Sequence, residues 1–148
     1  MKVLFLDIDG VCNCVGTGQS YLGFVGIDPE LAARVAGIVD DTGCTVVLSS
    51  SWRHFDGGRE EVDRMVHPTF DITPSVKGGF RGEEIALWLE RHPDVESYAI
   101  LDDNDDFLEG QPLFRTTWSS GITAEIAAEV AAHLNAGARG RTDDSAEA

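Results

Sequence analysis

Three short apolar runs and one mixed run predict the strands of a central sheet. The first is residues 2–6, and the second, residues 44–48, is β-branched and uncharged. The third is SYAIL at residues 97–101, and LFRTTW at residues 113–118 predicts a fourth strand. Continuous apolar runs of this length are typical of strands that are buried on both faces of a sheet.

Helical patterns separate these strands. Asp28-Pro29-Glu30 begins a helix, because it offers an N-cap aspartate, a proline at the first helical position and an acid in the first turn. Gly43 ends this helix. Further helices are expected at residues 52–66, 81–92 and 122–134. The glycine-rich segment 10–27 predicts a loop or small hairpin, and residues 67–80 predict a loop.

Alternating strands and helices predict an α/β fold: a Rossmann-like, doubly wound parallel sheet with helices on both faces. The chain has 148 residues, of which 43% are hydrophobic, which suits one domain around one core. We expect this domain to span residues 1–135. The tail, residues 136–148, lacks apolar anchors and is expected to be disordered.

The formal net charge of −15 limits the partners of the chain. An acidic surface repels phosphate backbones and anionic lipids, so we expect no tight non-specific nucleic-acid binding and no membrane partner. No apolar run is long enough to span a bilayer, and Asp7 interrupts the start too early for a secretory signal. The odd number of cysteines, three, agrees with a reducing compartment. We therefore expect a cytoplasmic location.

Polar residues follow three of the predicted strands. Asp7 and Asp9 follow the first, Ser49 the second, and Asp102 with Asp103 the third. Ligands of parallel sheets bind beyond the carboxyl ends of the strands, so these side chains are expected to meet. Clustered carboxylates need a metal ion, a cationic partner or exposure to water.

A cluster of hard oxygen ligands without histidine or thiolate favours Mg²⁺, which shares its coordination sphere with substrate phosphate. Such a cluster suits phosphoryl transfer. One carboxylate would attack phosphorus and form an aspartyl-phosphate, while a second would protonate the leaving oxygen and later activate water. A serine hydroxyl, backbone N–H groups and a Lys or Arg would stabilise the equatorial oxygens.

Four motifs in order resemble the haloacid dehalogenase-like (HAD) phosphohydrolases. They are DIDGV at residues 7–11, a hydrophobic strand ending at Ser49, a basic residue before a helix, and LDD at residues 101–103. SSSWR, RGEEIALWL, AILDD and LFRTTWSSGIT are similar to HAD domains associated with nucleic-acid repair, including polynucleotide phosphatases.

The resemblance implies a role for each matching residue. Asp7 would be the nucleophile and a metal ligand, and Asp9 the general acid and base, with its main-chain carbonyl also on the metal. Asp102 and Asp103 would complete the Mg²⁺ site. Ser49 would bind the transferring phosphoryl group; Ser50 and Ser51 stay open as alternatives, because one of the three serines is expected to cap the next helix.

The phosphate-site cation is Arg81 or Lys77. Arg81 is preferred because it immediately precedes the helix GEEIALWL, where the family's cation usually lies. Arg53 is expected to contact substrate phosphate. Trp52 either packs in the core or stacks on a base near the site.

The resemblance also implies a site without a cap domain, since residues 10–27 and 54–80 are too short for a core of their own. By the same resemblance, open sites of this kind accept large substrates or borrow a cover from another subunit. A nucleotide, a nucleic-acid end and a small metabolite all stay possible as the phosphorylated substrate. A local cluster of Arg53, Arg59, Lys77 and Arg81 would reconcile such a substrate with the acidic surface. The oligomeric state is not readable from the sequence.

Two other classes of function compete with the phosphohydrolase. A phosphoacceptor signalling domain also combines strand-end acids with a hydroxyl and a lysine, but it places a double acid after its first strand. Here Asp7-Ile8-Asp9 comes first, so the order disagrees. A non-catalytic HAD-like domain that binds a partner is the second rival, and the intact Asp7 and Asp9 argue against it.

Overall fold

A five-stranded parallel sheet forms the centre of the molecule, in a computed structural model that describes the backbone of residues 1–147 and the side chains of residues 1–137. In spatial order its strands are β5 (Asp71–Ile72), β4 (Thr45–Leu48), β1 (Lys2–Leu6), β6 (Ser97–Asp102) and β7 (Leu113–Arg115). The first strand of the chain therefore lies in the middle, and the sheet is wound outward from it in both directions. The predicted α/β, Rossmann-like fold class is confirmed.

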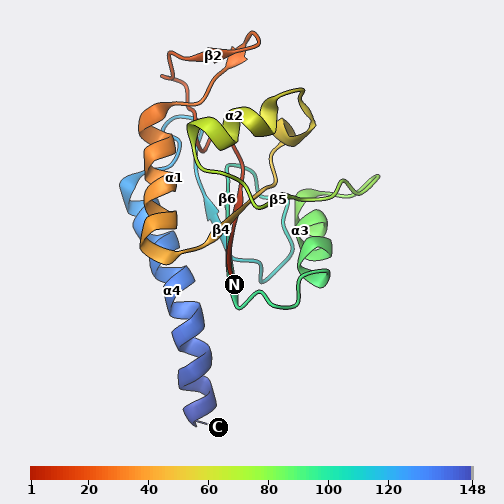
Figure 1. The fold of residues 1–148 in the computed structure, drawn as a ribbon, viewed down its shortest axis with the longest axis vertical. Helices are drawn as coiled ribbons and strands as arrows, with labels where there is room; N and C mark the ends of the chain where they lie inside the picture. The colour runs from red at the N-terminus through yellow and green to blue at the C-terminus, as the bar shows by residue number, and fades with distance from the viewer. Residues whose placement is uncertain (148) are drawn as a thin grey trace.

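Helices cover both faces of this sheet, as Figure 1 shows. They are α1 (Pro29–Thr42), the 3-10 helix η1 (Ser51–His54), α2 (Gly58–Met65), α3 (Arg81–Glu90) and α4 (Ala124–Glu147). Residues of α1 and α4 share one core cluster with Leu6, whereas residues of α3 share the other with Phe5. Two clusters form because successive residues of a strand point to opposite faces of the sheet.

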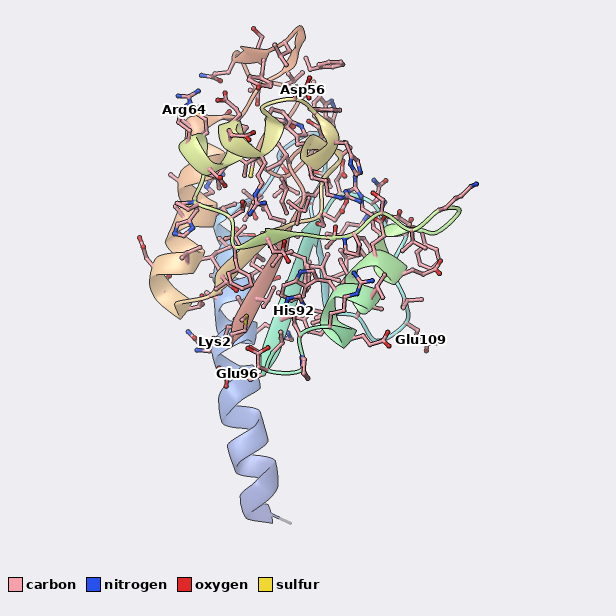
Figure 2. All side chains as sticks on the ribbon, turned by 45° about the vertical axis from the view of Figure 1, so that its right-hand side comes forward. Lys2, Asp56, Arg64, His92, Glu96 and Glu109 are labelled. Carbon is pink, nitrogen blue, oxygen red and sulfur yellow. The ribbon has the colours of Figure 1, made fainter. Side chains whose placement is uncertain are left out.

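The small hairpin of β2 (Ser20–Tyr21) and β3 (Phe24–Val25) lies with α2 at the end of the sheet away from the N-terminus (Figure 1). Figure 2 labels Lys2 and Glu96 at the lower end of the sheet, where β1 and β6 begin, and Asp56 near the upper end of the molecule. The hairpin and α2 therefore stand over the carboxyl ends of the parallel strands. Within residues 1–147, no inserted segment forms a cap domain.

The structure differs from the expected elements in four places. The single helix expected at residues 52–66 is divided into η1 and α2, because Gly57 takes a left-handed conformation with φ 76°. The fourth strand ends at Arg115 rather than at residue 118, and β5 lies inside the expected loop 67–80. Helix α4 extends past its expected end at residue 134.

The predicted disordered tail, residues 136–148, falls largely outside the described side chains. The domain boundary at residue 135 therefore stays a prediction. Among the described residues, no helix combines the length and the apolar composition that crossing a bilayer requires.

Candidate active site

The carboxyl ends of four neighbouring strands place a row of polar residues across the sheet. In spatial order the row is Thr73, Ser49, Asp7 and Asp102. Asp7, Ser49 and Thr73 each donate a backbone N–H to a carbonyl of the neighbouring strand at 3.0 Å, so the pairing continues past the strand ends. Residues paired across a parallel sheet project toward the same face. The strand ends therefore meet at one edge, as expected from the sequence.

Three carboxylates gather at the centre of this edge. Asp7, Asp102 and Asp103 each offer an oxygen, and these three oxygens lie within 4.8 Å of one another. Asp7 is 2% exposed and Asp102 is fully buried. Burial, followed by the neighbouring charge of Asp102, raises the pKa of Asp7 well above its ordinary value, and the same two causes raise the pKa of Asp103. Burial and mutual repulsion thus disfavour the ionised forms of these carboxylates when no cation is bound.

Arg81 supplies one positive charge to this cluster. Its Nη1 atom lies 3.1 Å from Oδ1 of Asp7 and 2.7 Å from Oδ2 of Asp102. Arg81 is the first residue of α3, so the start of this helix aims the guanidinium at the carboxylates. Burial alone would lower the pKa of Arg81, but the carboxylates of Asp7 and Asp102 raise it above its ordinary value.

Lys77, the alternative cation, lies on the segment between β5 and α3. Its side chain is exposed and makes no hydrogen bond or salt bridge within the described part of the chain. Of the two candidates, Arg81 is the one that contacts the carboxylates. Arg59 donates to Oγ1 and the carbonyl of Thr69 after α2, so it is held by that loop.

The three serines after β4 are in different environments. Oγ of Ser50 accepts a hydrogen bond from the backbone N–H of Trp52 at 3.2 Å and so caps η1. Oγ of Ser49 is buried and has no hydrogen-bond partner. Ser51 is the first residue of η1 and is partly exposed. Ser49 therefore has the hydroxyl that is free for a ligand.

Thr73 was not singled out from the sequence. It follows the two-residue strand β5, is 2% exposed, and its Oγ1 also lacks a hydrogen-bond partner. A buried hydroxyl left without a partner costs about 1–3 kcal/mol. Two of them, side by side in the row next to Asp7, are the polar groups most in need of a ligand or of bound water. A polar residue directly after a strand is the signal that would have found Thr73, but β5 is too short to be read from the sequence.

Asp9 lies outside the cluster of three carboxylates. Its Oδ1 accepts hydrogen bonds from Nδ2 of Asn13 at 2.9 Å and from the indole Nε1 of Trp52 at 3.3 Å. The residue as a whole is exposed. Asp7 and Asp9 thus occupy contrasting environments. Asp7 is buried beside like charges, whereas Asp9 is solvent-exposed and held in place by two neutral hydrogen-bond donors.

Gly10 allows the loop after β1 to pass close to the cluster. Its φ is 81°, and a Cβ atom at this position would overlap the carboxylate of Asp103. Its carbonyl accepts a hydrogen bond from Oγ1 of Thr116 at 2.6 Å, which ties the loop to the segment after β7. Glycine is required here both by conformation and by space.

Arg53 points inward rather than toward solvent. Nη1 donates to the carbonyls of Ser49 and Ser50 at 2.7 and 2.9 Å, and Nε donates to the carbonyl of Thr73 at 3.2 Å. Nη2 forms an ion pair with Glu84 of α3 at 3.0 Å. The guanidinium is thus engaged in holding the backbone behind the site, and its expected contact with substrate phosphate stays a prediction.

Over residues 3–144 the chain matches the family model described as the HAD domain in Swiss Army Knife RNA repair proteins. Neither the comparison with curated proteins nor the one with solved structures finds a match. The matched range begins at the second residue of β1 and takes in the other four strands of the sheet and every residue of the row at its carboxyl edge.

Proposed function

We propose that this chain, which belongs to the family of HAD domains in Swiss Army Knife RNA repair proteins, is a Mg²⁺-dependent phosphohydrolase that cleaves a phosphate monoester through an aspartyl-phosphate on Asp7. The observation that carries the proposal is the row at the sheet edge. It sets a buried carboxylate between a hydroxyl without a partner, Ser49, and a second buried carboxylate, Asp102. Phosphoryl transfer needs three groups side by side: a nucleophile, a hydrogen-bond donor to the phosphate oxygens, and a metal ligand.

The charge balance of the cluster supports a divalent cation. Asp7, Asp102 and Asp103 bring three carboxylates together, whereas Arg81 returns one positive charge. Hard carboxylate oxygens without histidine or thiolate suit Mg²⁺. These three residues, with the main-chain carbonyl of Asp9, would hold the ion. When bound, Mg²⁺ would neutralise charge on the phosphate and on the carboxylates.

In the proposed reaction, a carboxylate oxygen of Asp7 attacks phosphorus, and the bond from phosphorus to the leaving oxygen breaks. Asp9, in its protonated form, gives its proton to that leaving oxygen. A water molecule then attacks the aspartyl-phosphate and yields its proton to Asp9, which frees Asp7 and inorganic phosphate. Ser49 and Arg81 hold the equatorial oxygens during both steps. The exposed position of Asp9 supports this role, because water and the leaving group can both reach it.

The lack of a cap within residues 1–147 and the family support a proposal for the substrate class. An open site beside a short hairpin suits the phosphorylated end of a larger molecule, and the family's description names RNA repair. We therefore place a nucleotide or a nucleic-acid end ahead of a small metabolite. The net charge of −15 disfavours long contacts with a phosphate backbone, so recognition would concentrate on the end itself. The cytoplasmic location stays a prediction.

Hydrolysis of a generic aryl phosphate with Mg²⁺ tests the function. We expect turnover by the unaltered protein, and its loss in Asp7→Asn and in Asp9→Asn. Asp105→Asn is the matched control, because the side chain of Asp105 is 81% exposed on the loop after β6. Absence of turnover on any phosphate ester, with folded protein and metal, would contradict the proposal.

The same assay separates the two rival functions. A phosphoacceptor signalling domain would accumulate one phosphoryl group per chain, detectable by mass, with little turnover. A non-catalytic binding domain would show neither turnover nor phosphorylation. Asp7→Asn removes the phosphoryl acceptor in the proposed mechanism, so any phosphorylation of that variant would identify a different residue as the nucleophile.

A further inference from the structure

An aromatic cleft of about 290 Å³ opens beside Asp9. Besides Asp9, its walls are Phe24 and Val25 of β3, Trp52 and Phe55 around η1, and Trp118 after β7. Phe24 is 65% exposed, Trp118 43% and Phe55 39%. Aromatic side chains exposed together next to a reaction centre mark a binding surface, because a folded chain otherwise tends to bury them.

The cleft is braced by contacts from several segments. The ring of Tyr21 in the hairpin stacks on Trp52 at 5.3 Å, and its hydroxyl donates to the carbonyl of Asp56 at 3.5 Å. Figure 2 labels Asp56 at the upper end of the molecule, under the hairpin. The indole of Trp52 is itself hydrogen-bonded to Asp9, as described above. The cleft and the proposed acid–base residue are therefore held in a fixed relation.

We propose that this cleft binds the base of a nucleotide whose phosphate lies at Asp7. The inference rests on the proposed function, because Asp9 is both a wall of the cleft and the residue that would protonate the leaving oxygen. The group attached to that oxygen must therefore leave the reaction centre past the aromatic walls. Phe24 and Phe55 are nearly parallel, with their ring centroids 6.0 Å apart and an angle of 12° between their planes. The two rings stack on each other and form one apolar wall of the cleft, on which a planar π-system can pack, and every base offers one.

The volume of the cleft and the acidic charge of the protein limit which ligand can bind there. Small-molecule pockets span about 300–1,000 Å³, so this cleft matches one planar ring system rather than an extended chain. A base is neutral and binds by stacking, which an acidic protein can provide without a basic surface. Arg53 and Arg81 both point to internal partners and do not extend a positive track away from the site. The cleft therefore fits the terminal nucleotide and not a long stretch of backbone.

The experiment compares ligands with and without a base. Binding of adenosine 5′-monophosphate, adenosine 3′-monophosphate and ribose 5-phosphate is measured by calorimetry in Asp7→Asn with Mg²⁺, a variant chosen to prevent turnover. KM for the same three compounds is measured in the protein with Asp7 intact. Phe24→Ala and Trp118→Ala alter the cleft from two different segments. Phe70→Ala is the control, because Phe70 is also exposed (51%) but packs near Trp88 on the α3 side.

We expect at least one nucleotide to bind ten or more times more tightly than ribose 5-phosphate. Each cleft variant should weaken nucleotide binding about 5- to 100-fold, which is the range for loss of one stacking partner, and leave ribose 5-phosphate unaffected. Phe70→Ala should change neither. Equal affinity for nucleotides and ribose 5-phosphate, or no nucleotide binding, would overturn the inference.

The two proposals fail in different ways. Turnover without any preference for a base would leave the phosphohydrolase standing and remove the base site. A preference for nucleotides in calorimetry, lost in Phe24→Ala, would establish the base site even if no compound is hydrolysed. Melting curves of Phe24→Ala and Trp118→Ala show whether each variant stays folded, since Phe24 is 65% exposed and Trp118 43%.

Discussion

Arg53 and Glu84 form an ion pair across 3.0 Å, and their side chains are only 4% and 11% exposed. The second carboxylate oxygen of Glu84 accepts a hydrogen bond from the backbone N–H of Val76 at 3.1 Å. Because Arg53 also holds the carbonyls of Ser49 and Ser50, the pair links the serine segment, the β5–α3 loop and helix α3 behind the proposed phosphate site.

Glu84→Ala should lower the free energy of unfolding by about 3–5 kcal/mol, because it leaves the guanidinium of Arg53 buried without its counter-ion. Urea denaturation measures the change. The control is Glu83→Ala, since Glu83 is the exposed neighbour on the same helix. A loss below 1 kcal/mol for Glu84→Ala would mean that water replaces the carboxylate readily.

Ser49→Ala and Ser50→Ala should have opposite effects: the first should lower kcat and the second should lower stability. Ser50→Ala removes the N-cap of η1 and should lower stability by about 0.5–2 kcal/mol. Ser49→Ala removes a hydroxyl without a partner, so it should leave stability unchanged or higher while kcat on a phosphate ester falls about 100-fold or more. If the larger loss of kcat fell on Ser50→Ala, the roles of the two serines would have to be exchanged.

Thr73→Val should stabilise the protein by about 1 kcal/mol, because it replaces an unpartnered buried hydroxyl with a methyl group of the same shape. Thr69→Val is the matched control. The hydroxyl of Thr69 donates to Asp63 and accepts from Arg59, so its loss should lower stability. Thermal melts of both variants suffice. Destabilisation by Thr73→Val would show that bound water satisfies the hydroxyl.

Gly10→Ala should destabilise the protein more than Gly78→Ala does. Both glycines have positive φ, 81° and 73°, so both substitutions incur backbone strain of about 1–2 kcal/mol. Only at Gly10 does the added Cβ also meet the carboxylate of Asp103; around Gly78 there is open space. The difference between the two denaturation free energies isolates the overlap. Gly10→Ala should also reduce turnover by displacing Asp103.

Without metal, stability should fall as pH rises through the raised pKa values of Asp7 and Asp103. Burial and like charge raise both pKa values, so the folded state binds more protons than the unfolded state between the ordinary carboxyl pKa and the raised one.

Asp7→Asn removes one of these charges and should raise Tm by about 2–5 °C in metal-free buffer. Mg²⁺ should raise the Tm of the unaltered protein and have a much smaller effect on Asp7→Asn. Melting curves from pH 5 to 8, with and without Mg²⁺, check both statements.

The edge of the sheet could be predicted because strand ends leave a strong local signal. An apolar run that stops at an acid or a serine marks both a strand and its carboxyl end, as at Leu6-Asp7 and Leu48-Ser49. The start of α1 was equally readable. Asp28 accepts from the N–H of Glu30, and Gly43 takes the left-handed conformation that ends the helix.

What escaped prediction depends on contacts between distant segments. The Arg53–Glu84 pair joins residues 31 positions apart, and no local pattern shows that an arginine next to three serines turns inward. The strand β5 has only two residues and borders prolines and glycines, so its pairing with β4 sets it rather than any propensity. Thr73 stayed hidden for the same reason.

The pairing of the strands fixes the distances between the residues of the proposed active site. Neighbouring strands lie about 4.8 Å apart, so the spacing between Ser49, Asp7 and Asp102 is set by main-chain pairing and not by the length of any loop. The hairpin around Phe24 has no such role in the sheet. Exchanging that hairpin for an unrelated one should therefore change which substrate binds while the reaction itself continues. The sheet edge would determine the chemistry, and the hairpin would determine substrate selectivity.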